Sequence, residues 1–227
     1  MKAVILDVDG TLVDSNDAHA HAWVDAFAEA GITVDYGKVR RSIGMGGDKL
    51  MPAVSGPLRI EESSPLGERI STRRGEIFKG TYLPALRPTP GARDLVQRFL
   101  EEGFVLSIAS SAAEEELHPL LEAAGVADLI HRRTSSDDAE SSKPDPDIIH
   151  AALREAACEP PEAIMLGDTP YDVEAARQAG VVIVGLESGG WSAQDLDGAV
   201  AVYRNPAHVL VEYERSPFYA TRPTGTF

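Results

Sequence analysis

The chain has 227 residues, of which 43% are hydrophobic and 25% are charged. This apolar fraction excludes an intrinsically disordered protein, and the length suits one large domain or a domain that carries a smaller insert. Lys and Arg number 21 against 36 Asp and Glu, and the resulting net charge of −15 argues against a nucleic acid or an anionic membrane as the main partner.

The cysteine content and the N-terminal segment indicate a cytoplasmic protein. Cys158 is the only cysteine, so no internal disulfide can form, and no Cys/His cluster offers ligands for zinc. The apolar run at 3–6 is too short for a signal peptide or a membrane span, and no other run approaches the about 20 apolar residues that a span needs. We therefore expect a cytoplasmic location.

Short apolar runs that are spread along the chain predict the strands of a sheet. Continuous apolar runs of this length are typical of strands buried on both faces, as in a parallel sheet. Helical patterns at 91–102, 147–157 and 170–179 lie between several of these runs. This alternation predicts an α/β fold with a Rossmann-like, doubly wound, mainly parallel sheet. The five predicted strands cover residues 3–6, 104–109, 163–166, 181–186 and 199–203.

Residues 16–85 show a different pattern and are expected to form an all-helical cap inserted into this core. An apolar stripe from Ala18 to Ala30 ends at Gly31, and no strand-like run follows before residue 104. An insert directly after the first strand lies above the carboxyl edge of the sheet, where open α/β folds bind ligands. We therefore assign residues 1–15 and 86–227 to the catalytic core.

Two segments of the core are harder to assign. Pro119 interrupts a helical pattern at 114–124, so we expect that helix to begin near His118 with the proline in its first turn. The tail at 216–227 has no acidic residue and no clear periodicity. We expect this tail to be a surface strap or to be disordered.

Two aspartates at the end of the first predicted strand are the strongest functional signal. Asp7 and Asp9 lie in the segment Asp-Val-Asp-Gly-Thr, and side chains at i and i+2 share one face of a strand. An ordinary Asp-Gly turn explains Gly10 but not two carboxylates that repel each other. Such a pair suits a site with two roles, in which one carboxylate stays ionised as a nucleophile and the other has its pKa raised enough to carry a proton.

With three later segments, this motif resembles the haloacid dehalogenase-like superfamily over nearly the whole chain. The later segments are a strand that ends in Ser110, Lys143 before Pro-Asp-Pro, and Gly-Asp-Thr-Pro-Tyr-Asp at 167–172. The resemblance implies that Asp7 attacks phosphorus to give an aspartyl-phosphate. It also implies that Asp9 protonates the leaving oxygen and then activates the hydrolytic water.

The second and third motifs are expected to bind phosphate. The hydroxyl of Ser110 and the main-chain N–H of Ser111 can meet a phosphoryl oxygen, although a simple turn before a helix would also explain the serine. Lys143 can offset the charge of a phosphoryl group beside Asp7. The acidic residues around Lys143 in the sequence would also suit a lysine that is solvated in a loop. The order of the motifs along the chain favours the phosphate-binding role.

The fourth motif is expected to complete a magnesium site. Mg²⁺ prefers carboxylate and carbonyl oxygens, and the set of Asp7, the main-chain carbonyl of Asp9, and Asp168 would supply them. Asp172 falls at the third position of a helix that Thr169 would cap. Two interpretations of Asp172 remain open: it completes a capping box, or it supports the metal site or orients the lysine.

His19 is expected either to pack in the core or to support the catalytic residues. It could share one helix face with Trp23 and Phe27, and a histidine there is more often a core residue. β-Phosphoglucomutases, which the chain resembles here, also have a His at this distance from the first motif and four residues before a Trp. Both roles therefore stay open.

Other candidate features carry weaker signals. Gly44-Met45-Gly46-Gly47 follows no strand, so we expect a flexible turn and not a dinucleotide site. The segment 189–192 follows the predicted strand at 181–186 and could border the site, although a plain loop is the simpler interpretation. Three cations in the insert could meet an anionic substrate, but a solvated helix face is the simpler interpretation for them; they are Arg73, Arg74 and Lys79.

The resemblance favours a magnesium-dependent phosphatase of small phosphorylated metabolites. Dehalogenases and phosphonatases of the superfamily lack the second Asp, whereas Asp9 is present. Mutases of the β-phosphoglucomutase type carry an Arg after the glycine that corresponds to Gly44, and they pair two adjacent acids in the fourth motif. A sugar phosphomutase is therefore the alternative, and a non-catalytic regulatory or binding protein is a third possibility. Nothing in the sequence indicates the oligomeric state.

Overall fold

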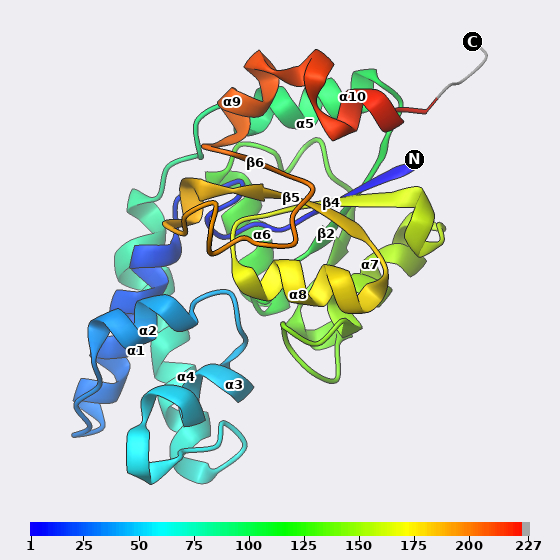
Figure 1. Cartoon of the computed structure of the whole chain (residues 1–227). Coiled ribbons are helices and arrows are strands. Elements are labelled where there is room, and N and C mark those ends of the chain that lie inside the picture. Colours follow the sequence, from blue (N-terminus) through cyan, green and yellow to red (C-terminus); the bar gives the residue numbers. More distant parts are fainter. Residues whose placement is uncertain (224–227) are drawn as a thin grey trace.

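A six-stranded parallel sheet lies at the centre of the molecule (Figure 1). The computed structural model describes residues 1–223, and within them the strand order is β3-β2-β1-β4-β5-β6. This arrangement confirms the predicted Rossmann-like α/β class. The strands are β1 (Ala3–Leu6), β2 (Val105–Ala109), β3 (Arg132–Thr134), β4 (Ala163–Gly167), β5 (Val182–Leu186) and β6 (Ala201–Tyr203).

All five predicted strands are present, and the strand that the sequence did not reveal is β3. Its residues, Arg-Arg-Thr, contain no apolar run, because β3 is a short strand at the edge of the sheet. Arg133 instead donates hydrogen bonds to the carbonyl oxygens of Ala127 and Ile130 in the preceding loop. A polar edge strand of three residues gives no signal in a search for buried strands.

Helices cover both faces of the sheet, and a hydrophobic cluster lies on each face. The side chains of β1 alternate between these two clusters. Val4 and Leu6 face one hydrophobic cluster, whereas Ala3 and Ile5 face the other. Helices α5, α9 and α10 lie over one face, and α7 and α8 lie over the opposite face (Figure 1). These helices and α6 are α5 (Ala92–Glu101), α6 (Glu114–Ala123), α7 (Asp147–Ala156), α8 (Pro170–Ala179), α9 (Pro206–Val211) and α10 (Pro217–Thr221).

The segment between β1 and α5 contains helices and no named strand, as far as the described residues extend. It projects from the carboxyl edge of the sheet (Figure 1). We call residues 16–85 the helical insert. Its α-helices are α1 (Asn16–Glu29), α2 (Tyr36–Ser42), α3 (Gly47–Val54) and α4 (Pro65–Ile77). None of the helices within residues 1–223 is long and apolar enough to cross a membrane.

Helix α6 begins earlier than predicted and contains Pro119 in its interior. The expected start near His118 is wrong, because the helix begins at Glu114 and has three acidic residues in its first turn. Acidic side chains there interact favourably with the helix dipole. Leu117 is buried one turn before Leu121, so hydrophobic packing extends the helix on both sides of the proline.

The tail folds back onto the core. The expectation that it is disordered or a surface strap is therefore wrong for residues 217–221. Residues 217–221 form helix α10, which Ser216 caps by accepting a hydrogen bond from the N–H of Tyr219. Phe218 is fully buried, with its ring 4.7 Å from the ring of Phe99. The final residues, 224–227, lie outside the described part of the chain.

Candidate active site

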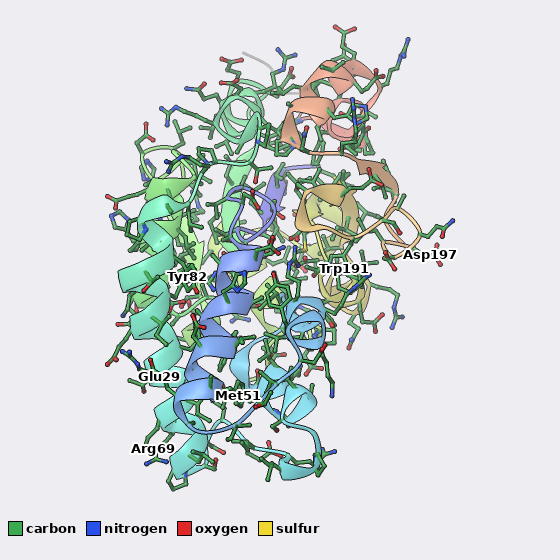
Figure 2. The ribbon with its side chains drawn as sticks, turned by 90° about the vertical axis from the view of Figure 1, so that its left-hand side faces the viewer. Glu29, Met51, Arg69, Tyr82, Trp191 and Asp197 are labelled. Atoms are coloured by element: carbon green, nitrogen blue, oxygen red, sulfur yellow. The ribbon has the colours of Figure 1, made fainter. Side chains whose placement is uncertain are left out.

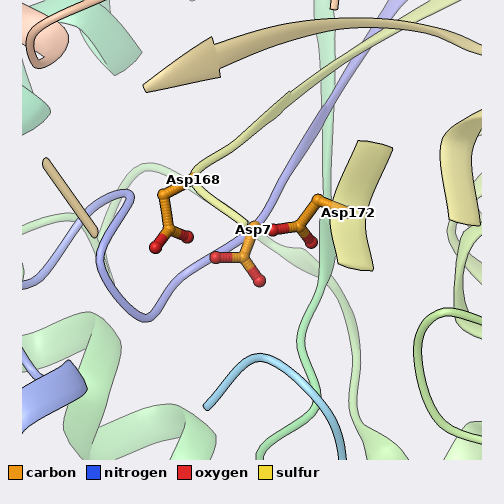
Figure 3. Close-up of side chains that lie close together, drawn as sticks. All are labelled: Asp7, Asp168 and Asp172. Atoms are coloured by element: carbon orange, nitrogen blue, oxygen red, sulfur yellow. The ribbon is translucent and has the colours of Figure 1, made fainter. Parts of the chain in front are cut away.

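The carboxyl ends of β1 and β4 bring two aspartates together. Asp7 follows β1 and Asp168 follows β4, and these strands pair directly, so that the N–H of Asp7 donates to the carbonyl oxygen of Leu166 at 3.0 Å. Asp172, in the first turn of α8, completes the group (Figure 3). All three carboxylates are buried, and each offers an oxygen within 4.8 Å of the others. The sheet thus concentrates three acidic groups at one point.

Lys143 is the buried cation of this cluster. Its Nζ lies 2.7 Å from Asp7 Oδ1, 2.7 Å from Asp172 Oδ1 and 2.8 Å from the carbonyl oxygen of Ala109. Burial lowers the pKa of Lys143, but the charges of Asp172 and Asp7 outweigh burial and raise this pKa above its usual value. The side chain is 1% exposed, so the alternative of a solvated loop lysine is wrong.

Asp172 combines two of the roles that the sequence left open. Its Oδ2 accepts hydrogen bonds from the N–H of Thr169 at 3.0 Å and from Thr169 Oγ1 at 2.7 Å, which completes the predicted capping box. Its other oxygen, Oδ1, forms the ion pair with Lys143. Asp172 therefore both caps α8 and orients the lysine, and its carboxylate also belongs to the cluster that could hold a metal ion.

Asp168 is held by residues from three segments of the chain. Thr11 Oγ1 donates to its Oδ1 at 3.1 Å, and Asn16 Nδ2 donates to its Oδ2 at 2.9 Å. A Cβ atom at Gly189 would lie 1.7 Å from Asp168 Oδ2, and one at Gly10 would lie 2.2 Å from the same oxygen. The prediction of a plain loop around Gly189 is therefore wrong, because only glycine leaves room for this carboxylate.

The donor set at this point fits a hard divalent cation. Burial, together with the charges of Asp172 and Asp9, raises the pKa of Asp7 to about 7, although Lys143 opposes this shift. Burial and the charges of Asp7 and Asp172 also raise the pKa of Asp168 well above its usual value. One lysine does not balance these carboxylates. A cation bound between Asp7 and Asp168 would relieve the excess negative charge with oxygen ligands.

Asp9 lies next to the cluster and contacts the first helix of the insert. Its Oδ1 accepts a hydrogen bond from Ser15 Oγ at 2.5 Å and lies 2.8 Å from His19 Nε2. The ring of His19 stacks on Phe78, with centroids 3.9 Å apart. His19 is therefore both packed in the interior and in contact with a candidate catalytic group. Both contacts use Oδ1, which leaves Oδ2 of Asp9 as the oxygen that can exchange a proton with a ligand.

The pKa values of the two aspartates differ in the direction opposite to the sequence expectation. Burial raises the pKa of Asp9, but the charge and hydrogen bond of His19, with the hydrogen bond from Ser15, outweigh burial and hold this pKa below its usual value. The pKa of Asp7 is the raised one. Repulsion within the pair does not decide this order, because Asp172, Lys143 and His19 approach the two aspartates from elsewhere in the chain.

The two serines after β2 occupy different positions. Ser110 is fully buried, and its Oγ accepts a hydrogen bond from the N–H of Ala112 at 3.0 Å. In this structure the Ser110 hydroxyl therefore stabilises a turn before the helix, as the simpler interpretation expected. Ser111 lines the pocket described next, and its Oγ donates to the carbonyl oxygen of Gly44 at 3.0 Å. Ser111 thus joins the core to the insert.

A small pocket lies between the sheet edge and the insert. Asp7, Asp9 and His19 line it together with Trp23 of α1. Residues 44–47 also line it, so the predicted glycine-rich turn lies in its wall. The pocket has a volume of about 60 Å³.

The three cations of the insert have different surroundings. Arg73 is 45% exposed and pairs with Glu29 and Glu76, and Lys79 pairs with the exposed Glu115, so the simple interpretation of a solvated face is correct for these two. That interpretation is wrong for Arg74, which lines the pocket and pairs with a buried glutamate of α6.

Two contributors to the site escaped the sequence analysis. Asn16 binds Asp168, and its only signal is that a polar amide begins the helix directly after the first motif. Glu116 is 1% exposed in the first turn of α6, where an acidic residue is usually solvated. Its burial depends on Arg74, which is 42 residues away in the chain.

Comparisons with known proteins find similar sequences and similar folds. The sequence profile of the family described as "Haloacid dehalogenase-like hydrolase" matches residues 4–186. A phosphoglycolate phosphatase of Rhodospirillum rubrum is 31% identical over 209 residues, which cover 89% of this chain and 86% of the relative. The crystal structure of a hydrolase from Pseudomonas syringae is 28% identical, with a TM-score of 0.87 over 95% of this chain and 99% of that one.

A third protein shares the fold at lower identity. The structure of CbbY from Rhodobacter sphaeroides in complex with xylulose-(1,5)bisphosphate has a TM-score of 0.77 over 92% of this chain and 96% of that one. The two sequences are 23% identical, so this likeness concerns the fold alone.

Proposed function

The chain belongs to the haloacid dehalogenase-like hydrolase family and is a phosphoric monoester hydrolase, and on this basis we propose that it hydrolyses a small phosphorylated metabolite through an aspartyl-phosphate at Asp7. The observation that carries the proposal is the position of Asp7. Its carboxylate lines the pocket, lies 2.7 Å from Lys143 Nζ, and belongs to the buried acidic cluster at the end of β1.

In the first step, an oxygen of Asp7 attacks phosphorus, and the bond between phosphorus and the leaving oxygen breaks. The negative charge of the bound phosphate ester would raise the pKa of Asp9, so that Asp9 can carry a proton and donate it to that leaving oxygen, and the product leaves as a neutral alcohol. Lys143 Nζ beside Asp7 supplies a positive charge near the phosphoryl oxygens. Ser110 and Ser111, which follow β2, are the proposed further contacts of the phosphoryl group.

In the second step, water attacks the phosphorus of the aspartyl-phosphate. Asp9 takes the proton from this water, the bond between phosphorus and the Asp7 oxygen breaks, and inorganic phosphate leaves. Ser15 and His19 hold Oδ1 of Asp9, so that Oδ2 serves as the proton-exchanging oxygen in both steps. His19 and Asp172 are thus proposed as positioning residues, the first for Asp9 and the second for Lys143.

The acidic cluster supports the use of Mg²⁺. Asp7, Asp168 and the main-chain carbonyl of Asp9 would hold the ion. When bound, the ion supplies positive charge that favours ionised Asp7 and offsets the charge of the phosphoryl group. Thr11 and Asn16 would keep Asp168 oriented through their hydrogen bonds to its two oxygens.

The helical insert is proposed to act as a cap that opens for substrate and closes for chemistry. Residues of the insert and of the sheet edge line one pocket together, which is the arrangement expected of a cap over the site. Contacts across the boundary include the ion pair of Lys49 with Asp145 at 2.5 Å and the hydrogen bond from Ser111 to Gly44. Closure of this kind would exclude bulk water from the aspartyl-phosphate.

Release of inorganic phosphate tests the proposal directly. With p-nitrophenyl phosphate and a panel of phosphorylated metabolites, the protein should release phosphate in Mg²⁺ and lose at least about 99% of this activity in excess EDTA, because the buried carboxylates would repel the substrate. Adding Mg²⁺ in excess over EDTA should restore the activity. Full activity in EDTA would contradict the metal site, and no phosphate release from any ester would favour a non-catalytic protein.

The same assay, followed by phosphorus NMR, separates hydrolysis from mutase chemistry. Residues 45–47 place a methionine and two glycines where a mutase needs groups that hold a second phosphate. With β-glucose 1-phosphate, Mg²⁺ and a trace of the 1,6-bisphosphate, inorganic phosphate should therefore accumulate faster than glucose 6-phosphate. The reverse order would establish the mutase alternative.

A further inference from the structure

A buried ion pair forms part of the wall of the pocket. Arg74 of α4 and Glu116 of α6 both line it, and Arg74 Nη1 donates to both carboxylate oxygens of Glu116, at 3.0 and 2.7 Å. The side chain of Glu116 is 2% exposed and that of Arg74 is 14% exposed. The guanidinium carbon of Arg74 also lies 5.1 Å from the centroid of the Trp23 ring. The pair therefore belongs to the interior of the site and not to the surface.

This pair determines the charge that a leaving group meets. Arg74 is the only Lys or Arg among the residues that line the pocket in the described part of the chain. Glu116 neutralises it, His19 is paired with Asp9, and the remaining ionisable group of the lining, Asp7, is acidic. Apart from the point where the phosphoryl group binds, the pocket thus offers no uncompensated positive charge. A second anionic group on the substrate would find no free cation.

Displacing Glu116 to free Arg74 is unfavourable. The hydrogen bonds of the Glu116 carboxylate in the described residues both come from Arg74, and the carboxylate is screened from water. A substrate carboxylate or second phosphate that took over Arg74 would leave this buried charge without a partner, which is strongly destabilising. A hydroxyl group avoids this conflict, because it can donate to a Glu116 oxygen and accept from Arg74 while the pair stays intact.

Arg74 also has spare capacity for such a contact. Both of its hydrogen bonds to Glu116 use Nη1, whereas its Nε–H is buried without a partner in the described residues. Because Arg74 lines the pocket and uses only Nη1 for the ion pair, its remaining N–H groups can serve a ligand acceptor oxygen without breaking that pair. The hydroxyl oxygen of a polyol or sugar is such an acceptor and adds no charge.

Resting on the phosphatase function proposed above, we propose that Glu116 is a specificity-determining residue. It neutralises Arg74 and makes the enzyme prefer phosphate monoesters whose leaving group carries hydroxyl groups over those whose leaving group carries a second anionic group. The enzyme therefore discriminates against phosphocarboxylates and bisphosphates, even though its relative from Rhodospirillum rubrum is named a phosphoglycolate phosphatase.

Two substrates of nearly equal size test this proposal. 2-Hydroxyethyl phosphate and 2-phosphoglycolate differ by a CH₂OH group in place of a carboxylate. With Mg²⁺ present, kcat/KM of the wild-type protein should be at least tenfold higher for 2-hydroxyethyl phosphate. Glu116→Gln keeps the shape of the side chain and frees the charge of Arg74, so it should shift the ratio of the two kcat/KM values at least tenfold toward 2-phosphoglycolate.

Two further variants separate specificity from a structural role. Glu116→Asp keeps the charge and should retain the wild-type preference, whereas Glu115→Gln removes an exposed neighbour that pairs with Lys79 and should leave the ratio unchanged. If the pair only fastened α4 to α6, Glu116→Gln would change both kcat/KM values equally. That result, or a wild-type enzyme that hydrolyses 2-phosphoglycolate at least as well, would overturn the inference alone. Absence of phosphate release from every ester would overturn the proposed phosphatase function as well.

Discussion

Asp7→Asn should lower kcat by about 10⁴-fold or more, because an amide in this position cannot form the aspartyl-phosphate. The substitution removes one of three carboxylates that lie within 4.8 Å of one another, so it relieves repulsion in the folded state. We therefore expect the circular dichroism spectrum to match that of the wild-type protein. Phosphate release from p-nitrophenyl phosphate in Mg²⁺ measures the effect.

A matched control comes from an aspartate outside the site. Asp197 is exposed and lies at the outer edge of the molecule, well away from the cluster (Figure 2). Asp197→Asn makes the same chemical change and should retain wild-type kcat. If Asp7→Asn turned over substrate at a comparable rate, the nucleophile would have to be a different group.

Asp9→Asn should make turnover depend steeply on the leaving group. General acid catalysis typically contributes 10²- to 10⁴-fold, so kcat for an alkyl phosphate should fall by about 10³-fold. An aryl leaving group such as p-nitrophenolate departs without protonation and needs less help in the first step. Activity on p-nitrophenyl phosphate should therefore fall at least about tenfold less than activity on the alkyl ester.

Stability measurements distinguish the loss of acid–base catalysis in Asp9→Asn from a folding defect. Asp9 accepts a hydrogen bond from Ser15 and contacts His19, so Asp9→Asn removes a charge-assisted interaction and should lower the melting temperature slightly. A general loss of folded protein would reduce both activities by the same factor. Equal losses on the two substrates, with the protein folded, would contradict the role of Asp9 as acid and base.

Much of the fold could be predicted because parallel strands buried on both faces leave a plain sequence signal. The runs at 3–6 and 163–166 contain only apolar residues, and each ends at an acidic residue or at a glycine that precedes one. Strand β3 is polar and lies at the edge of the sheet, so it gives no such signal. Pro119 misled the prediction of α6, because packing of Leu117 and Leu121 outweighs the local preference of proline.

The site was predictable where a residue follows directly from a strand end. Asp7 and Asp168 needed only the rule that carboxyl ends of neighbouring parallel strands meet. Contacts between distant segments were not predictable, as with Asn16 and Asp168, or Arg74 and Glu116. The predicted order of the pKa values of Asp7 and Asp9 was wrong for the same reason. Asp172, Lys143 and His19 approach these aspartates only in the folded chain.

Direct detection of the phosphorylated residue is the sharpest test of the mechanism. Asp9→Asn should slow the breakdown of the intermediate, so this variant can be mixed with p-nitrophenyl phosphate and Mg²⁺, quenched in acid within one turnover, digested and mapped by mass spectrometry. We predict one phosphoryl group on the peptide that contains Asp7, and none in Asp7→Asn treated in the same way. Turnover with no phosphorylated peptide at any quench time, or with the phosphoryl group on another residue, would contradict the aspartyl-phosphate at Asp7.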